Sequence, residues 1–380
     1  MRADSPLRSR DFVRVTVGNF FFFLTFASFF LLPLHIRELG GSERTVGFLM
    51  GTTGISGLVS VLIVGALLDR YGRGRFLRGG MAVMGVASAA FLATSAIGPL
   101  MFALRIVQGL AFSASFNAAA TLAAELAPPA RRTSALGIFG ISTLLTHAIA
   151  PSLGEQIVAV GGFGLLFAIA GVYCAIGLAI VWTLPTPRRH AHAGPPPAPL
   201  RRVPGFVAAI ATIACCGGAF GSVLTFVPTF VRDEGLGVVS AFFLAYTTTA
   251  VGVRIVGGGA GDRLGHRPVV LPALALLAVA VGSLALVHSM TTLVLAGLVF
   301  GAAQGLVYPT LNAYTVELVP LVQLGRAQSM YNGAFNLGTT FGAMVMGNVV
   351  QVYGHRAMFA GAGGLVVVAL AVFALGRSGT

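Results

Sequence analysis

Two stretches of the sequence match each other: GALLDRYGRGR at residues 65–75 and GGAGDRLGHR at residues 258–267. Each has a glycine, then Asp-Arg, then a second glycine followed by basic residues, and the two are 193 residues apart. Both lie between long apolar blocks, so their charges fall at the ends of predicted helices. Glycine permits close helix approach and a tight turn. The chain therefore repeats a charged interhelical loop.

Three further matches occur in the same order, at offsets between 192 and 196 residues. They pair residues 33–40 with 228–235, residues 108–109 with 304–305, and residues 125–128 with 317–320. Four ordered matches at nearly one offset indicate a duplicated sequence. We expect one half at residues 1–184 and the other at residues 204–380. Residues 185–203, rich in Pro and Arg, are expected to be a linker because they cannot span a membrane.

The composition is that of a membrane protein. Hydrophobic residues make up 56% of the 380 residues, charged residues 9%, and the mean hydropathy is +0.89. Soluble globular chains carry about 25% charged residues, so an ordinary soluble enzyme is excluded. Backbone groups in lipid must bond within their own segment, and about 20 apolar residues span a bilayer as a helix. We predict an all-α membrane protein with twelve transmembrane helices, at 12–34, 45–68, 77–96, 99–126, 133–156, 163–184, 204–230, 239–261, 268–288, 291–318, 326–350 and 356–375.

The net charge of +13 comes from 24 basic residues, all of them Arg, against 11 acidic residues. The arginines cluster in short loops between apolar blocks, so we do not interpret them as a nucleic-acid-binding surface. With the N-terminus inside, 18 arginines fall in cytoplasmic segments and 4 on the opposite side. Cytoplasmic loops carry the excess of basic residues. This bias predicts that both termini are cytoplasmic.

The repeated loop resembles a signature of the major facilitator superfamily, and Arg105-x-x-Gln108-Gly109 resembles a second one. A third signature, found in the fifth span of antiporter members, is only partly present around Pro151 and Gly154. The resemblance covers the whole chain and implies two parallel six-helix repeats with alternating access around a midplane cavity. It further implies a monomer in the bacterial inner membrane, similar to drug and metabolite efflux permeases, with a small-molecule substrate, protons as a candidate coupling ion, and no cofactor, metal or nucleic acid.

The resemblance places a gate at the cytoplasmic ends of the helices. Arg70, Arg73 and Arg75 can pair with a carboxylate at another helix end, and Glu125 is the candidate partner. Breaking and remaking such pairs is a rigid-body gate; the alternative is that these charges only set topology and cap helices. The expected gate residues are Gly65, Asp69, Arg70, Gly72, Arg73, Glu125, Gly258, Asp262, Arg263, Gly265 and Glu317.

Two arginines, Arg105 and Arg254, fall within predicted spans, whereas every acidic residue falls at a helix end or in a loop. A charge at mid-helix costs about 2.5–3.5 kcal/mol on insertion scales, so it needs a role. Two buried cations without a central carboxylate indicate an anionic or acceptor-rich ligand. In the alternative interpretation, Arg105 binds backbone carbonyls of the first span and Arg254 bridges to Asp262 or a neighbouring helix end.

Other polar residues within the spans complete the expected cavity. The histidine side chain in water titrates near neutrality, so His147 is a candidate proton carrier, or a buried histidine of structural role. The spacing of Gln304, Tyr308 and Asn312 places them on one helix face, and Asn332 and Asn336 share another. The expected cavity and coupling residues are Asn19, Arg105, Gln108, His147, Arg254, Gln304, Tyr308, Asn312, Asn332 and Asn336.

These features favour a secondary transporter that exports an amphipathic small molecule. The first alternative is an importer or facilitator of an organic anion or other metabolite, suggested by the two buried arginines. A membrane-embedded enzyme would need a cluster of His, Asp or Glu at metal or acid–base spacing. The seven histidines show no such spacing apart from His190 and His192 in the linker, so we expect no enzyme.

Overall fold

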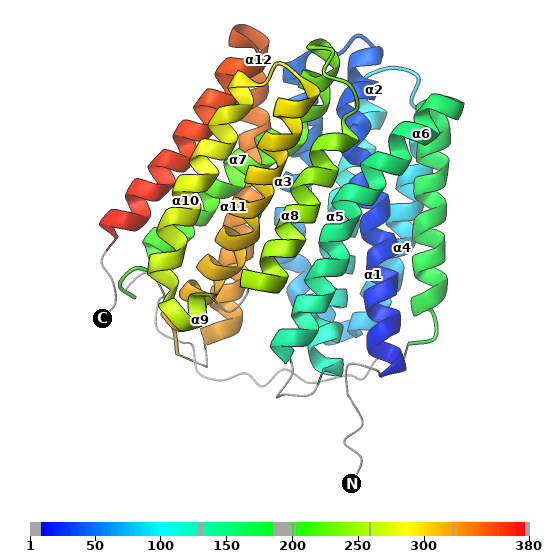
Figure 1. The fold of residues 1–380 in the computed structure, drawn as a ribbon. Helices are drawn as coiled ribbons and strands as arrows, with labels where there is room; N and C mark the ends of the chain where they lie inside the picture. Colours follow the sequence, from blue (N-terminus) through cyan, green and yellow to red (C-terminus); the bar gives the residue numbers. More distant parts are fainter. Residues whose placement is uncertain are drawn as a thin grey trace. The chain divides into compact units, whose positions relative to one another are not determined.

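The computed structural model describes residues 9–127, 132–184, 200, 203–257, 260–320 and 323–376, without the side chains of 61–71, 132–134, 260 and 262. The secondary structure of the described residues is helical, with no strand (Figure 1). In chain order the elements are α1 (Arg10–Ser28), η2 (Phe29–Leu31), α2 (Leu32–Glu38), α3 (Glu43–Tyr71), α4 (Arg73–Ala90), η3 (Phe91–Ala93), α5 (Pro99–Leu126), α6 (Arg132–Val181), α7 (Phe206–Asp233), α8 (Ser240–Gly257), α9 (Ala260–Leu264), α10 (His266–Ser283), η6 (Leu284–Leu286), α11 (Met290–Glu317) and α12 (Leu324–Leu375).

Nine helical segments among the described residues are long and apolar enough to cross a membrane. This agrees with the predicted all-α membrane class. Helices α6 and α12 contain 50 and 52 residues, more than twice the length that one span requires. Each is interrupted by glycine in a non-helical conformation, α6 at Gly161 and Gly162 and α12 at Gly354.

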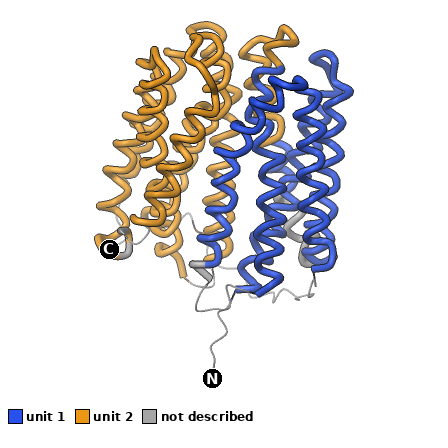
Figure 2. Tube along the Cα trace, turned by 45° about the vertical axis from the view of Figure 1, so that its right-hand side comes forward, with its two compact units in different colours: residues 1–35, 55–193 blue, residues 36–54, 194–380 orange. Residues whose placement is uncertain are grey.

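The chain divides into two compact units, shown in separate colours in Figure 2. Unit 1 comprises residues 1–35 and 55–193, and unit 2 comprises residues 36–54 and 194–380. Residues 36–54 belong to the first half of the repeated sequence, yet they group with unit 2. Helix α3 therefore begins in unit 2 and ends in unit 1. The predicted linker, residues 185–203, lies almost entirely outside the described residues.

The sequence repeat is also a repeat of local structure. Helix α4 with η3 covers residues 73–93, and α10 with η6 covers 266–286, which are equal lengths at an offset of 193. Glycines with positive φ recur in register: Gly40 and Gly235 at 82° and 62°, Gly72 and Gly265 at 89° and 84°, Gly162 and Gly354 at 68° and 80°. Turns that only glycine adopts readily have thus been kept in both copies.

Each unit packs equivalent helices in the same way. In unit 1, α1 packs against α6, and α4 against α5 and α6; in unit 2, α7 packs against α12, and α10 against α11 and α12. Small residues allow this close approach, as is usual between membrane helices. In unit 2, Gly217 and Gly221 of α7 face the backbone of α12. A side chain at either position would separate the two helices.

The core of unit 1 is aromatic. Phe22 and Phe23 of α1 are 0% and 5% exposed, and they pack against Phe112 of α5. Phe112 in turn packs against Phe116. Phe22 and Phe23 thus fill the space between α1 and α5.

The conserved turn geometry predicts how glycine variants affect stability. Gly72 caps the start of α4 at φ 89° and ψ 133°, where a side chain costs about 1–3 kcal/mol. Gly79 of the same helix has open space around the added Cβ, and Gly to Ala in a helix gains about 0.5–1 kcal/mol. Gly72→Ala should therefore lower the midpoint of thermal unfolding in detergent and Gly79→Ala should leave it unchanged or raise it. Equal midpoints for the two variants would contradict the assigned backbone.

Candidate functional site

Arg105 lies in a buried hydrogen-bonded network of unit 1. Its side chain is on α5, 3% exposed, and its Nη1 donates to Gln108 Oε1 at 2.8 Å. Gln108 Nε2 in turn donates to Ser88 Oγ of α4 at 3.1 Å. The guanidinium carbon lies 5.7 Å from the ring centre of Phe29, within range of a cation–π contact. These contacts favour the structural alternative for Arg105, since its guanidinium is held by Gln108 of the same helix and by the Phe29 ring of η2.

The other predicted residues of unit 1 make separate contacts. Asn19 of α1 donates from Nδ2 to Thr143 Oγ1 of α6 at 3.0 Å. Asn19 is fully buried, and its Oδ1 has no hydrogen-bond partner among the described residues. An unsatisfied buried acceptor costs about 1–3 kcal/mol, so this oxygen is a candidate for binding a ligand donor. His147 is half-buried, with its ring edge-on to Phe30 at 5.0 Å.

The two predicted polar stripes of unit 2 meet at Tyr308. Its hydroxyl donates to Asn332 Oδ1 of α12 at 2.9 Å, and its carbonyl accepts from the Tyr331 hydroxyl at 2.6 Å. Gln304, one turn earlier on α11, is 4% exposed and its Oε1 has no hydrogen-bond partner among the described residues. The stripes thus join α11 to α12 and leave one amide oxygen available.

Asn312 and Asn336 do not join this contact. Asn312 is half-buried on α11. Asn336 is exposed, and its backbone carbonyl accepts hydrogen bonds from the hydroxyls of Thr339 and Thr340. The place of Asn312 and Asn336 in a substrate cavity stays a prediction.

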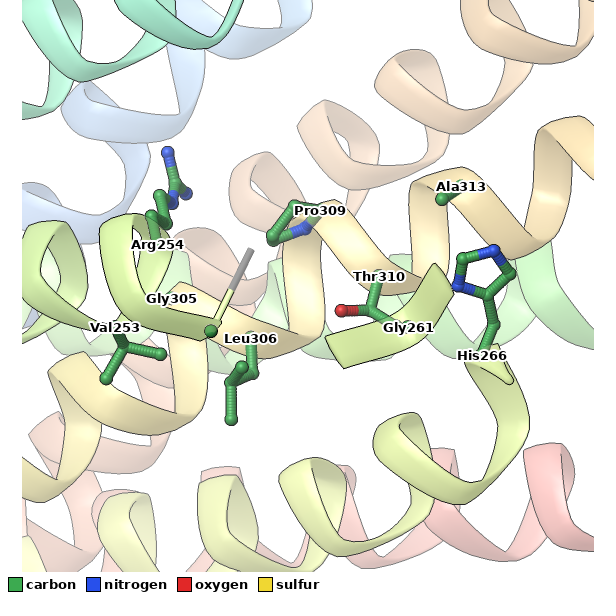
Figure 3. A pocket seen from close by; sticks show the side chains of 10 residues that line it. Val253, Arg254, Gly261, His266, Gly305, Leu306, Pro309, Thr310 and Ala313 are labelled. Carbon is green, nitrogen blue, oxygen red and sulfur yellow. The ribbon is translucent and has the colours of Figure 1, made fainter. Parts of the chain in front are cut away.

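Arg254 lines a pocket of unit 2 formed by α8, α9, α10 and α11. Figure 3 shows Arg254 at one end and His266 at the other, with Pro309 and Thr310 between them. Arg254 Nε and His266 Nδ1 are buried without a hydrogen-bond partner among the described residues. The pocket encloses about 50 Å³, whereas ligand sites for drug-sized molecules measure about 300–1,000 Å³. It has room for a few waters or one small anion, not for a drug-sized substrate.

The repeated loop has the same geometry in both units. Gly72 precedes α4 and Gly265 precedes α10, both with positive φ. The first residue of each helix then pairs with a glutamate at the end of the next helix. Arg73 forms an ion pair with Glu125, and His266 Nε2 lies 2.7 Å from Glu317 Oε1.

The expected pairing of Arg73 with Glu125 is thus present, and His266 takes the place of arginine in the second copy. Each pair lies within one unit and fastens two helix ends. The role of these loops as a gate stays a prediction. Arg263 is exposed on α9. The side chains of Gly65, Asp69, Arg70 and Asp262, and the whole of Gly258, lie outside the described residues.

Sequence analysis missed a charged cluster at the other end of α3, entirely within unit 2. Arg37 Nε lies 3.2 Å from Glu43 Oε1, and Arg37 Nη2 lies 3.7 Å from Asp233 Oδ2. Arg232 Nη1 donates to Glu38 Oε1 at 3.1 Å. The repeat of residues 33–40 at 228–235 contained the signal, since Arg37-Glu38 and Arg232-Asp233 are equivalent positions. The sequence shows the equivalence but not that the two copies exchange partners.

A hydrogen-bonded group lies beneath these ion pairs. Thr229 Oγ1 is 3.2 Å from Glu43 Oε2 and 2.9 Å from His355 Nε2. Glu43 precedes the predicted span 45–68 and is 5% exposed; burial raises its pKa to about 7, against the lowering effects of Arg37 and the Thr229 hydrogen bond. His355 lies between the last two predicted spans, and burial lowers its pKa although Asp233 opposes this. Glu43 thus titrates near neutral pH.

Comparisons with known proteins agree with this architecture. Residues 15–259 and 238–379 match the family described as Major Facilitator Superfamily. The chain is 23% identical over 363 residues to the staphylopine export protein of Staphylococcus aureus, covering 89% of this chain and 88% of that protein. It is 26% identical to the "Probable nitrate/nitrite transporter NarK2" of Mycobacterium tuberculosis, covering 82% of each. A solved D-xylose-proton symporter has the same fold, with a TM-score of 0.81 at 15% identity, covering 97% of this chain and 98% of that one.

The Arg105 network predicts strong coupling between its members. In a double-mutant cycle of Arg105→Leu and Gln108→Leu, the coupling free energy of unfolding should be about 1.5–3 kcal/mol, the range for a hydrogen bond to a charged group. The measurement is chemical unfolding in mixed micelles. The matched control pairs Arg105→Leu with Asn117→Leu, because the side chain of Asn117 bonds to Ser113 of α5 and not to Arg105 among the described residues. Additive effects in the Arg105–Gln108 cycle would contradict the structural role.

Proposed function

Since the chain belongs to the major facilitator superfamily and is a secondary transporter, not an enzyme, we propose that it exports an amphipathic small molecule by alternating access. The observation that carries the proposal is the similarity to an export protein over nearly the whole length of both chains. The polar contacts of unit 2 fit the same proposal. Tyr308, Asn332 and Gln304 offer uncharged hydrogen-bonding groups, which suit a ligand that is partly apolar.

The proposed transporter has twelve spans in two parallel six-helix repeats. The glycine interruptions of α6 and α12 support this number, since each divides a helix into two segments of spanning length. The recurrence of α4–η3 as α10–η6 supports the repeat. We place the protein as a monomer in the bacterial inner membrane, with both termini cytoplasmic on the basis of the arginine bias. On this topology the loops at Gly72 and Gly265 face the cytoplasm and form its gate.

The second candidate function is transport of an organic or inorganic anion. The pocket beside Arg254 favours it, since Arg254 Nε has no hydrogen-bond partner in the part of the chain that the structure describes. The similarity to a nitrate/nitrite transporter favours it too. The hydrogen bond of Arg105 to Gln108 and its contact with Phe29 weaken it, because this cation already has partners. Export of an amphipathic compound therefore remains the first proposal.

A transport assay in proteoliposomes tests the proposal. A panel of labelled amphipathic compounds and organic anions, with and without a pH gradient, should yield transport of an amphipathic compound. Tyr308→Phe removes the hydroxyl bonded to Asn332 and should slow that transport about 2- to 10-fold per folded molecule, the effect of one hydrogen bond.

Tyr314→Phe on the same helix is the matched control, since Tyr314 packs its ring on Phe373 and should transport at the wild-type rate. Transport restricted to anions and abolished by Arg254→Gln would replace the first proposal with the second.

A further inference from the structure

Three contacting residues break the internal repeat. Glu43, Thr229 and His355 touch one another, and their counterparts at offsets of 195, 195 and 192 residues are Val238, Leu34 and Phe163. All three counterparts are apolar, although the surrounding turns and ion-pair positions recur in both copies. Burying ionisable and hydroxyl groups costs free energy. The other copy has the same turns with apolar residues at these three positions, so the fold does not need polar groups there. Their presence in one copy therefore indicates a functional role.

Thr229 links the carboxylate to the imidazole through a single hydroxyl proton. Its Oγ1 lies within hydrogen-bond distance of Glu43 Oε2, His355 Nε2 and the Phe226 carbonyl oxygen. A hydroxyl donates one hydrogen bond at a time and accepts others. With ionised Glu43, the hydroxyl donates to the carboxylate and accepts from His355 Nε2. With protonated Glu43, the carboxyl donates to Thr229, which can then donate to His355 Nε2 or to the carbonyl.

Charged groups from three helices act on Glu43. From α2, Arg37 lies 3.2 Å from its Oε1. From α7, the Asp233 carboxylate opposes its ionisation. From α12, His355 Nε2 lies 3.8 Å from Glu43 Oε1, and His355 Nδ1 lies 4.0 Å from Asp233 Oδ2.

The remaining charges nearby are engaged elsewhere. Glu234 pairs with Arg356 at 2.7 Å, and its charge also acts on His355. On α3 itself, Arg44 donates to Asn348 Oδ1 at 2.6 Å. Arg232 pairs with Glu38 at the exposed edge of the cluster.

We propose that Glu43, with Thr229 and His355, is the proton-binding site that controls opening of the non-cytoplasmic end of the transporter. When Glu43 is buried at this end it holds a proton, and when the end opens Glu43 meets water and releases it. Proton binding therefore favours the closed end and proton loss favours the open end. Its place in a transport cycle rests on the proposed function, because an exporter must close this end after it releases its cargo.

A proton fits this site better than a metal ion. Glu43, Asp233 and His355 offer ligand atoms within 4.8 Å of one another, a spacing that a divalent cation could use. Arg37 lies beside both carboxylates, so its positive charge opposes a second cation. A proton on Glu43 neutralises only the buried carboxylate and leaves Arg37 paired with Asp233.

The magnitude follows from the two environments of Glu43. Its pKa is about 7 when buried and 4.5 at its ordinary value in water. A carboxyl whose pKa is raised in one state favours that state at low pH, and the preference is lost as pH rises through the raised value. The ratio of closed to open ends should therefore fall about 30-fold between pH 5.5 and pH 8.

Cysteine accessibility measures this ratio without any substrate. Val46, 0% exposed on the first turn of α3, becomes the reporter as Val46→Cys after replacement of Cys174, Cys215 and Cys216. Maleimide labelling is compared at each pH with and without Glu43→Gln, so that the intrinsic pH dependence of the thiol cancels. The labelling rate relative to Glu43→Gln should rise about 30-fold from pH 5.5 to pH 8.

Matched variants separate proton binding from a merely structural role. Glu38→Gln removes an exposed carboxylate of the same cluster and breaks its pair with Arg232. It should change the ratio of closed to open ends by the same factor at every pH, and therefore keep the full pH dependence. Thr229→Val removes a hydrogen bond that stabilises ionised Glu43, so it should move the midpoint to higher pH, which loss of packing alone would not do.

Three outcomes would overturn the proposal. The first is the same pH dependence with and without Glu43→Gln. The second is an unshifted midpoint in Thr229→Val. The third is a slower maleimide labelling of Val46→Cys in the presence of Zn²⁺, with this protection lost in both Glu43→Gln and His355→Gln. That result would assign a metal site to these residues. If the pH response holds but no compound of the panel is transported, the proton site stands and the export proposal fails.

Discussion

Ion pairs exchanged between Arg37-Glu38 and Arg232-Asp233 connect the two copies of the repeated sequence. Arg37 reaches Asp233, and Arg232 reaches Glu38, so equivalent positions of a duplicated sequence contact each other reciprocally. A two-fold relation produces such a contact, because residue i of one copy then contacts residue j of the other, and residue j of the first copy contacts residue i of the other. The side chains are 36–47% exposed, and ion pairs of this kind contribute at most about 1 kcal/mol. They can therefore break and re-form within a transport cycle.

The buried carboxyl group of Glu43 makes this end of the protein sensitive to pH, which the exposed ion pairs alone would not do. Exposed ion pairs respond little to pH near neutrality, since Arg stays charged and ordinary carboxylates stay ionised. Glu43 is different because burial raises its pKa to about 7. Glu43 is also the first residue of α3. Residues 43–54 of this helix belong to unit 2, and residues 55–71 belong to unit 1. A change at Glu43 thus acts on a helix that runs from one unit into the other.

Sequence patterns predicted the features that have a local physical cause: the helices, the glycine turns and one ion pair at a helix end. Apolar length predicted the helices, and the repeat predicted that Gly72 and Gly265 begin equivalent helices. Helix-end charges predicted the pair of Arg73 and Glu125. In each case the cause is local, namely backbone hydrogen bonding in lipid, a positive φ, or a neighbouring helix end.

Contacts between distant segments were beyond sequence reasoning. The bond of Gln108 to Ser88 joins α5 to α4, and no local pattern in either helix predicts this pair. The i, i+4 spacing placed Asn332 and Asn336 on one helix face but did not predict the bond of Asn332 to Tyr308 of α11. In the Glu43–Thr229–His355 group, Thr229 is 186 residues from Glu43 and 126 residues from His355, and nothing in the local sequence of Glu43 marks it as buried. Only the failure of the repeat at these three positions could have drawn attention to them.

Charge exchange tests whether the reciprocal pairs Arg37–Asp233 and Arg232–Glu38 close this end of the transporter. The measurement is the transport rate, per folded molecule in proteoliposomes, of Arg232→Glu alone and of Arg232→Glu combined with Glu38→Arg. If the pairs close this end of the transporter, the single variant places like charges together and should transport several-fold more slowly, and the double variant should recover most of the wild-type rate. A single variant that transports at the wild-type rate, or a double variant no faster than the single one, would contradict the account.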